Sequence, residues 1–358
     1  MYKVVRFKQE EPYLKDFLDF PKSLYKKKFR TQNEKDEREI LLGQHVLSKY
    51  FTVQPLLVYS EDGGKLISRA LLTSYPEDDS LYFGYFESLD NRDAVLQLFS
   101  EIEKIAEQGG YKRIIGPIDC SFWIKYRLKT DHFENRPYIG EPYNRSYYLN
   151  LLENCGLSVS ERYLSNSFLR LDLAGSYYQK YLRRFASFKE KGYQFFSPTK
   201  DTFDRCMSEI YQLVLALYAD FPAFKPISEN DFKQHFQYFK YISDFRMIKI
   251  AYFNGQAVAF LVTLPDYKNI LTQKLTLSTK LKVFFTRRRA NNYVSLYLGV
   301  KKEHLGLSSA IVTPVYQQIN AHHAGAITAL IHQGKITETY NQRNLSAVYN
   351  YVLLEKST

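Results

Sequence analysis

The pattern of apolar and polar positions is most informative between Tyr293 and Lys335. An apolar, β-rich run from Tyr293 to Val300 is followed by a polar break and then by a short stretch of small residues around Gly306. Apolar residues then recur at helical spacing as far as Ile319. A second apolar run, Ala326–Ile331, follows. The pattern predicts a strand, a turn, an amphipathic helix and a second strand.

A strand that leads through a turn into the start of a helix can bind an anion. The N–H groups of the first helical turn have no partner within the helix, and the helix dipole favours negative charge at that end. An ordinary β-α-β connection that binds nothing would show the same pattern. From these residues alone, both interpretations stay open.

The rest of the chain repeats this kind of pattern. Asp62-Gly63-Gly64 and Asn254-Gly255 predict hairpin turns between alternating strands. Expected helices cover residues 11–28, 31–50, 91–109, 147–155, 177–191, 202–218 and 229–241. Expected strands cover residues 1–7, 53–59, 65–75, 81–86, 113–118, 163–173, 193–197, 245–253, 256–265 and 349–355. The similar order of elements in each half predicts two α/β domains, residues 1–175 and 176–358.

Composition limits the classes of partner. A chain of 358 residues is long enough for about two domains. Its formal net charge of +11 favours an anionic partner: CoA phosphates, an acidic carrier protein, nucleic acid or a membrane surface. Cys120, Cys155 and Cys206 are too few and too scattered for a disulfide framework or a zinc site, so we expect no metal and a reducing, cytoplasmic setting.

Neither end of the sequence nor its interior suggests a membrane anchor. The first residues lack the basic, apolar and small-residue order of a signal peptide. No apolar run approaches the roughly 18 residues that span a bilayer. The segment Lys274–Arg289 carries six basic and no acidic residues, interleaved with apolar ones. It predicts either a basic amphipathic helix that faces phosphate, a carrier or a membrane, or a solvated helix face.

Several sequence segments of the chain resemble those of bacterial proteins with two GCN5-related N-acetyltransferase (GNAT) units. These segments are FLDFPKSLYK (Phe17–Lys26), YFGYFESLDN (Tyr82–Asn91), IIGPID (Ile114–Asp119), EPYNRSYYLNLLENCG (Glu141–Gly156), VAFLVTLPDY (Val258–Tyr267) and YNYVLLEK (Tyr349–Lys356). The resemblance covers nearly the whole chain. It implies an α/β fold of two tandem GNAT-like units, each a mixed, mostly antiparallel sheet flanked by helices.

The resemblance also implies a cofactor site in the C-terminal unit. Acetyl-CoA, or another acyl-CoA, would lie between the fourth and fifth strands, with its pyrophosphate on the turn after the fourth. The matching positions are Leu298, Gly299, Val300, His304, Leu305, Gly306, Leu307, Ser308 and Ser309. Glu303 stands where the family has glutamine or arginine, and an acidic residue there opposes pyrophosphate unless it points away. The N-terminal unit passes from Phe86 into a helix without a glycine turn, so we expect it to be degenerate.

Acyl transfer to an amine needs an oxyanion donor, a base and an acid. A backbone N–H near Leu298 to Val300 is the expected donor. The resemblance suggests Tyr340 as the acid, and His332, at a strand end, is the candidate base, since imidazole is a common proton acceptor in catalysis. Packed, structural roles for both residues stay open. Candidate substrate-binding residues are Asn144, Tyr147, Asp266 and Tyr267, although Asn144 also suits a helix cap.

Three functions therefore remain open from the sequence. The first is transfer of acetyl from acetyl-CoA to an amine of a small molecule, either a biosynthetic intermediate or an amine-bearing antibiotic inactivated in self-resistance. The second is an aminoacyl-tRNA-dependent transfer of the Fem type, which the net charge of +11 suits. The third is a ligand-binding module without catalysis.

Overall fold

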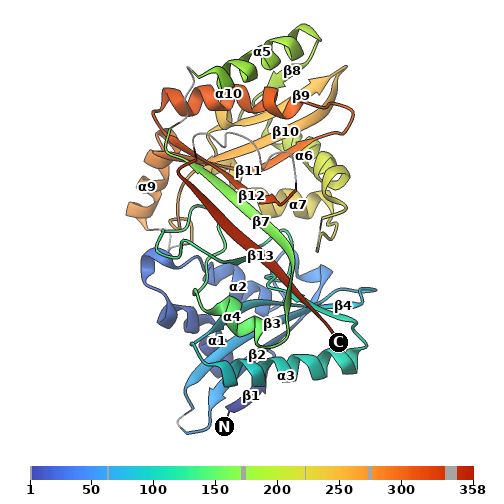
Figure 1. Ribbon diagram of the computed structural model, residues 1–358, viewed down its shortest axis with the longest axis vertical. Helices are drawn as coiled ribbons and strands as arrows, with labels where there is room; N and C mark the ends of the chain where they lie inside the picture. Colours follow the sequence, from blue (N-terminus) through green and yellow to red (C-terminus); the bar gives the residue numbers. More distant parts are fainter. Residues whose placement is uncertain (1, 63, 171–174, 222, 273–275, 335–344) are drawn as a thin grey trace. The chain divides into compact units, whose positions relative to one another are not determined.

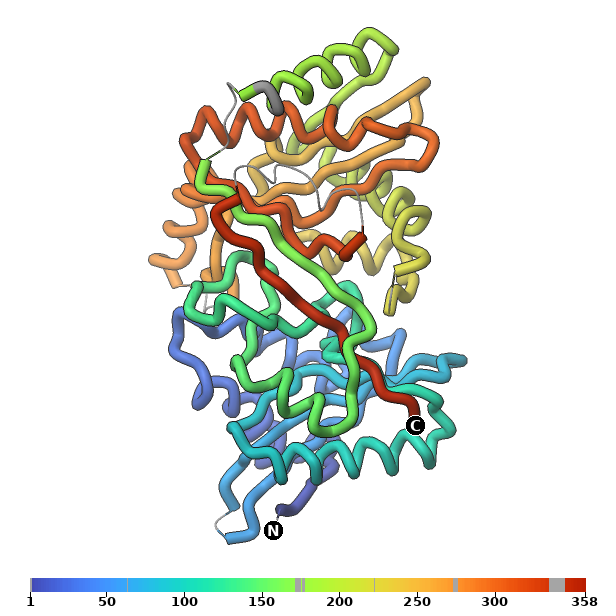
Figure 2. Tube along the Cα trace, viewed as in Figure 1, coloured from blue at the N-terminus to red at the C-terminus, as the bar shows by residue number. Residues whose placement is uncertain are grey.

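The computed structural model describes residues 2–62, 64–170, 175–221, 223–272, 276–334 and 345–358. The chain divides into two compact units. Unit 1 comprises Met1–Tyr163 and Asn350–Thr358, and unit 2 comprises Leu164–Tyr349. This division differs from the boundary at residue 175 expected from the sequence, because the last residues of the chain return to the first unit (Figure 2).

Unit 1 is a mixed sheet with helices on both faces (Figure 1). Its sheet runs β1-β2-β3-β4-β5 and then takes in the C-terminal strand β13. Helix α3 begins at the cap residue Asn91, whose side chain accepts a hydrogen bond from the Ala94 N–H, and it ends before Gly110 in the left-handed conformation. The elements are β1 (Tyr2–Arg6), α1 (Glu11–Leu24), η1 (Lys27–Phe29), α2 (Glu34–Leu41), η2 (Ser48–Tyr50), β2 (Thr52–Ser60), β3 (Leu66–Ser74), β4 (Ser80–Ser88), α3 (Arg92–Gly109), β5 (Arg113–Gly116), β6 (Leu128–Lys129) and α4 (Tyr148–Glu153).

Unit 2 repeats the order of unit 1. Its sheet runs β8-β9-β10-β11-β12 and then takes in β7, with α5 and α10 on one face and α6 and α7 on the other (Figure 1). The elements are α5 (Ser176–Glu190), β8 (Gln194–Phe196), α6 (Phe203–Tyr218), α7 (Glu229–Phe236), α8 (Phe239–Ile242), η3 (Phe245–Met247), β9 (Ile248–Phe253), β10 (Gln256–Pro265), α9 (Leu277–Arg288), β11 (Asn292–Val300), α10 (Leu307–Ala321) and β12 (Gly325–His332). The α/β fold of two similar units with mixed sheets, expected from the sequence, is confirmed.

The pairing directions show how closely the two units correspond. In each unit the first four strands pair antiparallel, and the fourth then pairs parallel with the fifth: β4 with β5, and β11 with β12. Each fourth strand also carries a one-residue bulge opposite the third strand. The repeat is therefore structural, although no repeat is evident in the sequence.

Two strands contain residues of both units. Strand β7 (Ser158–Phe168) begins in unit 1 and pairs with β12 of unit 2, whereas β13 (Ala347–Ser357) begins in unit 2 and pairs with β5 of unit 1. Each unit therefore completes its sheet with a strand that follows the other unit in sequence. Leu354 of β13 is fully buried in the core of unit 1.

Some expected elements differ from the structure. The helix expected over residues 31–50 ends at Leu41, because the chain turns at Gly43 with a φ of +71°. The helix expected over residues 229–241 is divided into α7 and α8, and the strand expected over residues 163–173 begins earlier, as β7. The short strand β6 was not expected.

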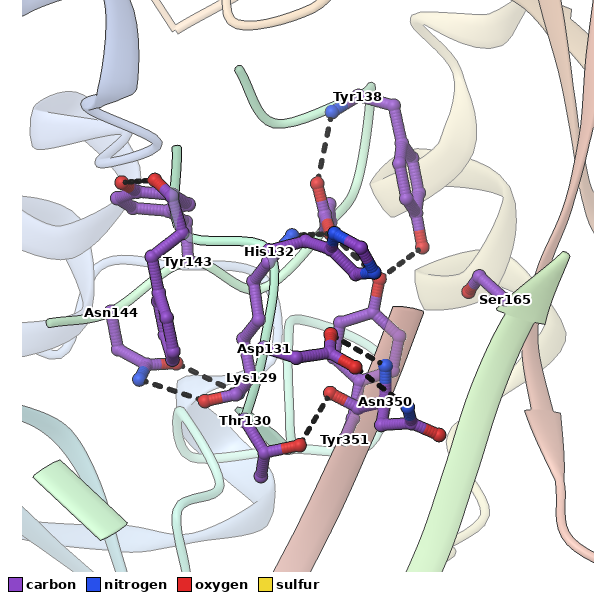
Figure 3. A network of polar contacts seen from close by, with 12 residues as sticks. Lys129, Thr130, Asp131, His132, Tyr138, Tyr143, Asn144, Ser165, Asn350 and Tyr351 are labelled. Carbon is purple, nitrogen blue, oxygen red and sulfur yellow. Dashed lines mark hydrogen bonds and ion pairs between the residues drawn. The ribbon is translucent and has the colours of Figure 1, made fainter. Parts of the chain in front are cut away.

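A buried polar network holds β13 in unit 1 (Figure 3). The Lys129 ammonium and the Glu141 carboxylate form an ion pair in which both side chains are almost fully buried. Tyr351 donates a hydrogen bond to the same carboxylate oxygen over 2.6 Å and lies 3.1 Å, oxygen to oxygen, from the Tyr138 hydroxyl. Burial raises the pKa of Glu141 and Tyr351. The network thus links β6, its following loop and β13.

This network generates a stability prediction. Lys129→Met should lower the free energy of unfolding by about 3–5 kcal/mol, because it leaves the buried Glu141 carboxylate without its cation. The double variant Lys129→Met/Glu141→Gln should recover much of the loss, since the buried group is then neutral. Urea unfolding monitored by circular dichroism measures both. The control Lys65→Met, at an exposed lysine, should change stability by less than about 0.5 kcal/mol.

Candidate functional site

The predicted anion-binding turn lies between β11 and α10 of unit 2. Gly306 caps α10 in the left-handed conformation, with a φ of +84°. A Cβ atom at Gly306 would have no neighbour closer than the Arg184 guanidinium, at 3.8 Å. Gly306 therefore allows the left-handed backbone conformation, and the absence of a side chain leaves space above the first turn of α10.

Basic residues lie on and beside this turn. Arg184, on α5, donates a hydrogen bond to the Ser309 hydroxyl over 2.9 Å, and that hydroxyl donates to the Gly306 carbonyl. Lys301 and Lys302 form no ion pair with the residues that the structure describes. Glu303, the departure from the family pattern, is exposed. The turn thus combines a helix N-terminus with cations, an arrangement that suits phosphate.

His304 is fixed in this turn by aromatic neighbours. Its Nδ1 lies 2.7 Å from the Tyr193 hydroxyl, and its ring packs edge-on against Tyr193 and Phe253. Within the described part of the chain, Nε2 makes no hydrogen bond. One edge of the ring is therefore structural, and the other can donate or accept a further hydrogen bond.

The fourth strand of unit 2 contains a bulge. Val262 of β10 pairs with Tyr297 and Thr263 pairs with Ser295, so Leu296 is the extra residue. The parallel ladder with β12 ends at Ser295 and Thr328, although both strands continue beyond it. A bulge residue is left outside the ladder. Leu296 is therefore a better candidate for a backbone donor than Leu298 to Val300.

The residues Leu298, Gly299 and Val300 pair regularly with β10. Gly299 has a packing role, because a Cβ atom there would lie 2.7 Å from Leu217 of α6 and 2.4 Å from the Phe260 ring. Leu307 is buried in the core beneath α10, Ser309 is buried, and Leu305 is 82% exposed. Ser308 is partly exposed in the first turn of α10.

Two aromatic side chains, Tyr218 and Phe221, lie close to β11. Tyr218, at the end of α6, donates a hydrogen bond to the Leu298 carbonyl over 3.3 Å and stacks on Phe221. The Phe221 ring meets the His332 ring, with centroids 5.9 Å apart. His332, the last residue of β12, is therefore close to groups that contact β11. Tyr340, the candidate acid, lies outside the described residues.

The corresponding place in unit 1 is filled by the chain itself. The Ile118 N–H donates to the Phe83 carbonyl over 2.7 Å, and the Asp119 carboxylate accepts from the Tyr85 N–H in the bulge of β4 over 2.6 Å. A Cβ atom at Gly84 would overlap the Ile118 carbonyl, at 1.9 Å. The bulge donor of unit 1 is thus already occupied. The start of α3 is likewise capped by Asn91.

A carboxylate of unusual pKa lies just beyond this bulge. Glu87 accepts hydrogen bonds on Oε2 from Tyr25, over 2.6 Å, and from Tyr148, over 2.7 Å. Burial raises its pKa to about 7, an effect that the nearby cations Arg69 and Lys125 oppose. Arg69 is itself held in a buried ion pair with Glu37. Unit 1 therefore contains a cluster of buried ionisable groups next to the bulge of β4.

The four expected substrate-binding residues have structural partners. Asn144 bonds to the backbone N–H and carbonyl of Lys129, so it joins a loop to β6 and does not cap a helix (Figure 3). Tyr147 donates to the Ser88 carbonyl. Tyr267 donates to the Ile242 carbonyl, and Asp266 pairs with Lys268. Asn144 and Tyr147 belong to unit 1, the other two to unit 2.

Within the described ranges, no three or more histidine, cysteine, aspartate or glutamate side chains are grouped to hold a metal. Cys120, Cys155 and Cys206 are free and buried. A search of the described residues finds no helix long and apolar enough to cross a membrane.

Comparison with known proteins identifies the fold. One solved structure is a tandem GNAT protein from the clavulanic acid biosynthesis pathway, which aligns over 100% of this chain and 98% of its own with a TM-score of 0.57 and 10% identity. The chain has the tandem GNAT fold. A second is the glucosamine N-acetyltransferase region of a fungal multi-domain β-N-acetylglucosaminidase, which covers 99% of this chain and 38% of its own with a TM-score of 0.56 and 12% identity. No protein-family model and no curated protein matches the sequence.

Sequence reasoning missed three features of this chain. Arg184 precedes the turn by more than a hundred residues, and only α5 packing against α10 brings it there. Tyr218 is one of 31 tyrosines, with no pattern to distinguish it. The bulge at Leu296 depends on pairing with β10, which the sequence does not display.

The raised pKa of Glu87 has a consequence for stability. Its value of about 7 in the folded protein lies above the ordinary 4.5, so folding favours the protonated form. The associated stability is present below pH 4.5 and is lost as the pH rises toward 7 and above, by on the order of 3 kcal/mol. Glu87→Gln should remove this pH dependence in urea unfolding measured from pH 4.5 to 8. Glu107→Gln, at an exposed position of α3, should leave the dependence unchanged.

Proposed function

We propose that the chain is an N-acyltransferase whose unit 2 binds an acyl-CoA, with acetyl-CoA as first choice, and transfers the acyl group to an amine of a small molecule. The observation that carries the proposal is the contrast between the two units. The turn of unit 2 is open at Gly306, with the Arg184 guanidinium beside it, whereas in unit 1 the start of α3 is capped by the Asn91 side chain and the bulge of β4 is bonded by Asp119.

The residues of unit 2 suit an acyl-CoA in two places. Arg184, Lys301, Lys302 and the Nε2 edge of His304 would hold the phosphates above the first turn of α10, where the dipole adds to their attraction. The bulge at Leu296 would supply a backbone N–H toward the thioester carbonyl. The exposed Glu303 carboxylate faces water, where its repulsion is screened.

Proton transfer is assigned to two side chains. His332, beside Phe221 at the end of β12, would take the proton that the attacking amine loses. Tyr340 would return a proton to the CoA thiolate as it leaves, which balances the exchange of amine for thiol. The acyl-CoA supplies the activated thioester when it is bound.

The proposal specifies only the chemical class of the acyl acceptor. The rings of Tyr218 and Phe221 beside His332 favour an amine on a molecule with an apolar or planar part. The tandem GNAT protein of similar fold comes from a biosynthesis pathway, which supports a biosynthetic intermediate, and an amine-bearing antibiotic remains within the class. Asn144, Tyr147, Asp266 and Tyr267 would act on such a molecule only by displacing their present partners.

The cofactor site can be tested at Gly306. Wild-type protein should bind one acetyl-CoA per chain in isothermal titration, and acetyl-CoA at about 100 times Kd should stabilise it by about 2.7 kcal/mol. Gly306→Val should abolish both effects, because its side chain occupies the space over the turn. Gly255→Val is the matched control, since Gly255 also has a positive φ, of +74°, but lies in the β9–β10 hairpin. Equal binding by the two variants, or no binding of any acyl-CoA to wild type, would reject the site.

The role of Arg184 can be tested separately from the backbone. Arg184→Met should raise the Kd for acetyl-CoA roughly tenfold, because one charge-assisted contact to phosphate is lost. Its exposed neighbour on the same helix, Arg183→Met, should change the Kd less than twofold. The difference between the variants should shrink for a CoA analogue without the pyrophosphate, such as acyl-pantetheine. An unchanged difference with that analogue contradicts phosphate binding by Arg184.

A further inference from the structure

Helix α9 of unit 2 exposes its apolar side chains to solvent and packs a more polar side on the protein. Only Thr279 is buried among the described residues of this helix. Four large apolar side chains are exposed: Leu277 by 76%, Leu281 by 49%, Phe284 by 39% and Phe285 by 64%. A surface helix normally turns its apolar stripe toward the core. Here the stripe faces away from it.

The exposed apolar residues of α9 recur at helical spacing. At 3.6 residues per turn, Leu277, Leu281, Phe284 and Phe285 share an arc of about 100°. Thr279, with half-buried Val283 and Thr286, lies on the opposite side, which packs on the protein. The exposed stripe is therefore a continuous apolar ridge along the helix.

Basic residues border this ridge on both sides. Lys280 and Arg287 lie along one edge, Lys282 along the other, and Arg288 within the stripe, where its guanidinium covers the Phe284 ring at 4.2 Å. Residues 276–289 contain no aspartate or glutamate. Lys280, Lys282 and Arg288 form no ion pair with residues that the structure describes. The charges are thus available to an outside anion.

A neighbouring helix extends the same surface. Helix α8 packs against α9, and the Arg287 guanidinium donates to the Tyr241 carbonyl over 2.9 Å. Tyr238, the N-cap residue of α8, and Tyr241, within α8, are 45% and 68% exposed. Tyrosine rings prefer the boundary between an apolar and an aqueous phase. We call these residues of α8 and α9 together the α9 surface.

We propose that the α9 surface binds the face of an anionic lipid bilayer, with the Leu and Phe side chains inserted among the acyl chains and the Lys and Arg side chains at the headgroup phosphates. A helix that lies in the interface needs an apolar stripe outward and cations along its edges, which is the arrangement found here. A bilayer also offers both an apolar phase and phosphates along the whole helix, with no need for a matching protein surface. The proposal does not depend on acyl transfer.

Vesicle binding by the full chain tests this surface. In sedimentation with sucrose-loaded vesicles in 100 mM salt, the protein should bind 30% phosphatidylglycerol in phosphatidylcholine at least tenfold more tightly than pure phosphatidylcholine. Lys280→Glu/Lys282→Glu should lower the partition coefficient more than tenfold, since each cation near the surface contributes roughly a fivefold factor. Leu281→Ser/Phe285→Ser should lower it to a similar extent.

Two control variants separate the α9 surface from general properties of the chain. Lys189→Glu/Lys191→Glu makes the same change in net charge at the end of α5, and Leu169→Ser removes another leucine, which is 82% exposed. Both should stay within twofold of wild type. Circular dichroism and thermal unfolding should be unchanged in all variants, because the substituted side chains are exposed.

Several results would overturn the proposal. These are failure of wild type to bind the anionic vesicles, equal loss in Lys189→Glu/Lys191→Glu, or full binding by Leu281→Ser/Phe285→Ser. Binding of an acidic carrier protein or RNA to the same lysines, without vesicle binding, would assign the surface to that partner. Phe285→Trp gives a direct readout, since its fluorescence should shift to the blue on anionic vesicles if the ring inserts.

Discussion

The two units depend on one constraint, the early end of the parallel ladder between their fourth and fifth strands. In unit 1 the ladder covers Ser80–Tyr82 with Arg113–Ile115, and in unit 2 it covers Asn292–Ser295 with Gly325–Thr328. Beyond it, backbone groups of the fourth strand need other partners, because buried N–H and C=O groups are seldom left unpaired. What takes their place decides what each unit can do.

Unit 1 satisfies this need from its own chain. Ile118 and Asp119 bond to β4, and the buried pair Arg69–Glu37 and the half-buried pair Lys125–Asp119 lie near the bulge. Buried ion pairs add little net stability but cost much when one partner is lost. These contacts hold the bulge of unit 1 in a fixed arrangement. In unit 2 the bulge is followed by a longer turn with a left-handed glycine and with Lys301 and Lys302, which form no ion pair with the described residues. This turn is the basis of the proposed acyl-CoA site.

The exchange of β7 and β13 makes each unit depend on residues distant in sequence. Leu354 fills the core built by residues of the first half, and Tyr351 completes the hydrogen bonds of Glu141. A contact between residues so far apart requires closure of a long loop before it contributes energy.

The sequence by itself determined the elements and their repetition. Period-3.6 and period-2 patterns, with the Gly turns, placed β10, α10, β12 and α3 within a few residues, because local spacing reports which face is buried. It also identified Gly306 and the basic segment that became α9. Only the tertiary structure decided the return of the last strand to unit 1, the position of Arg184 beside Gly306, and the closure of the unit 1 bulge by Asp119. These depend on pairing and packing between segments far apart in sequence, for which local periodicity carries no signal.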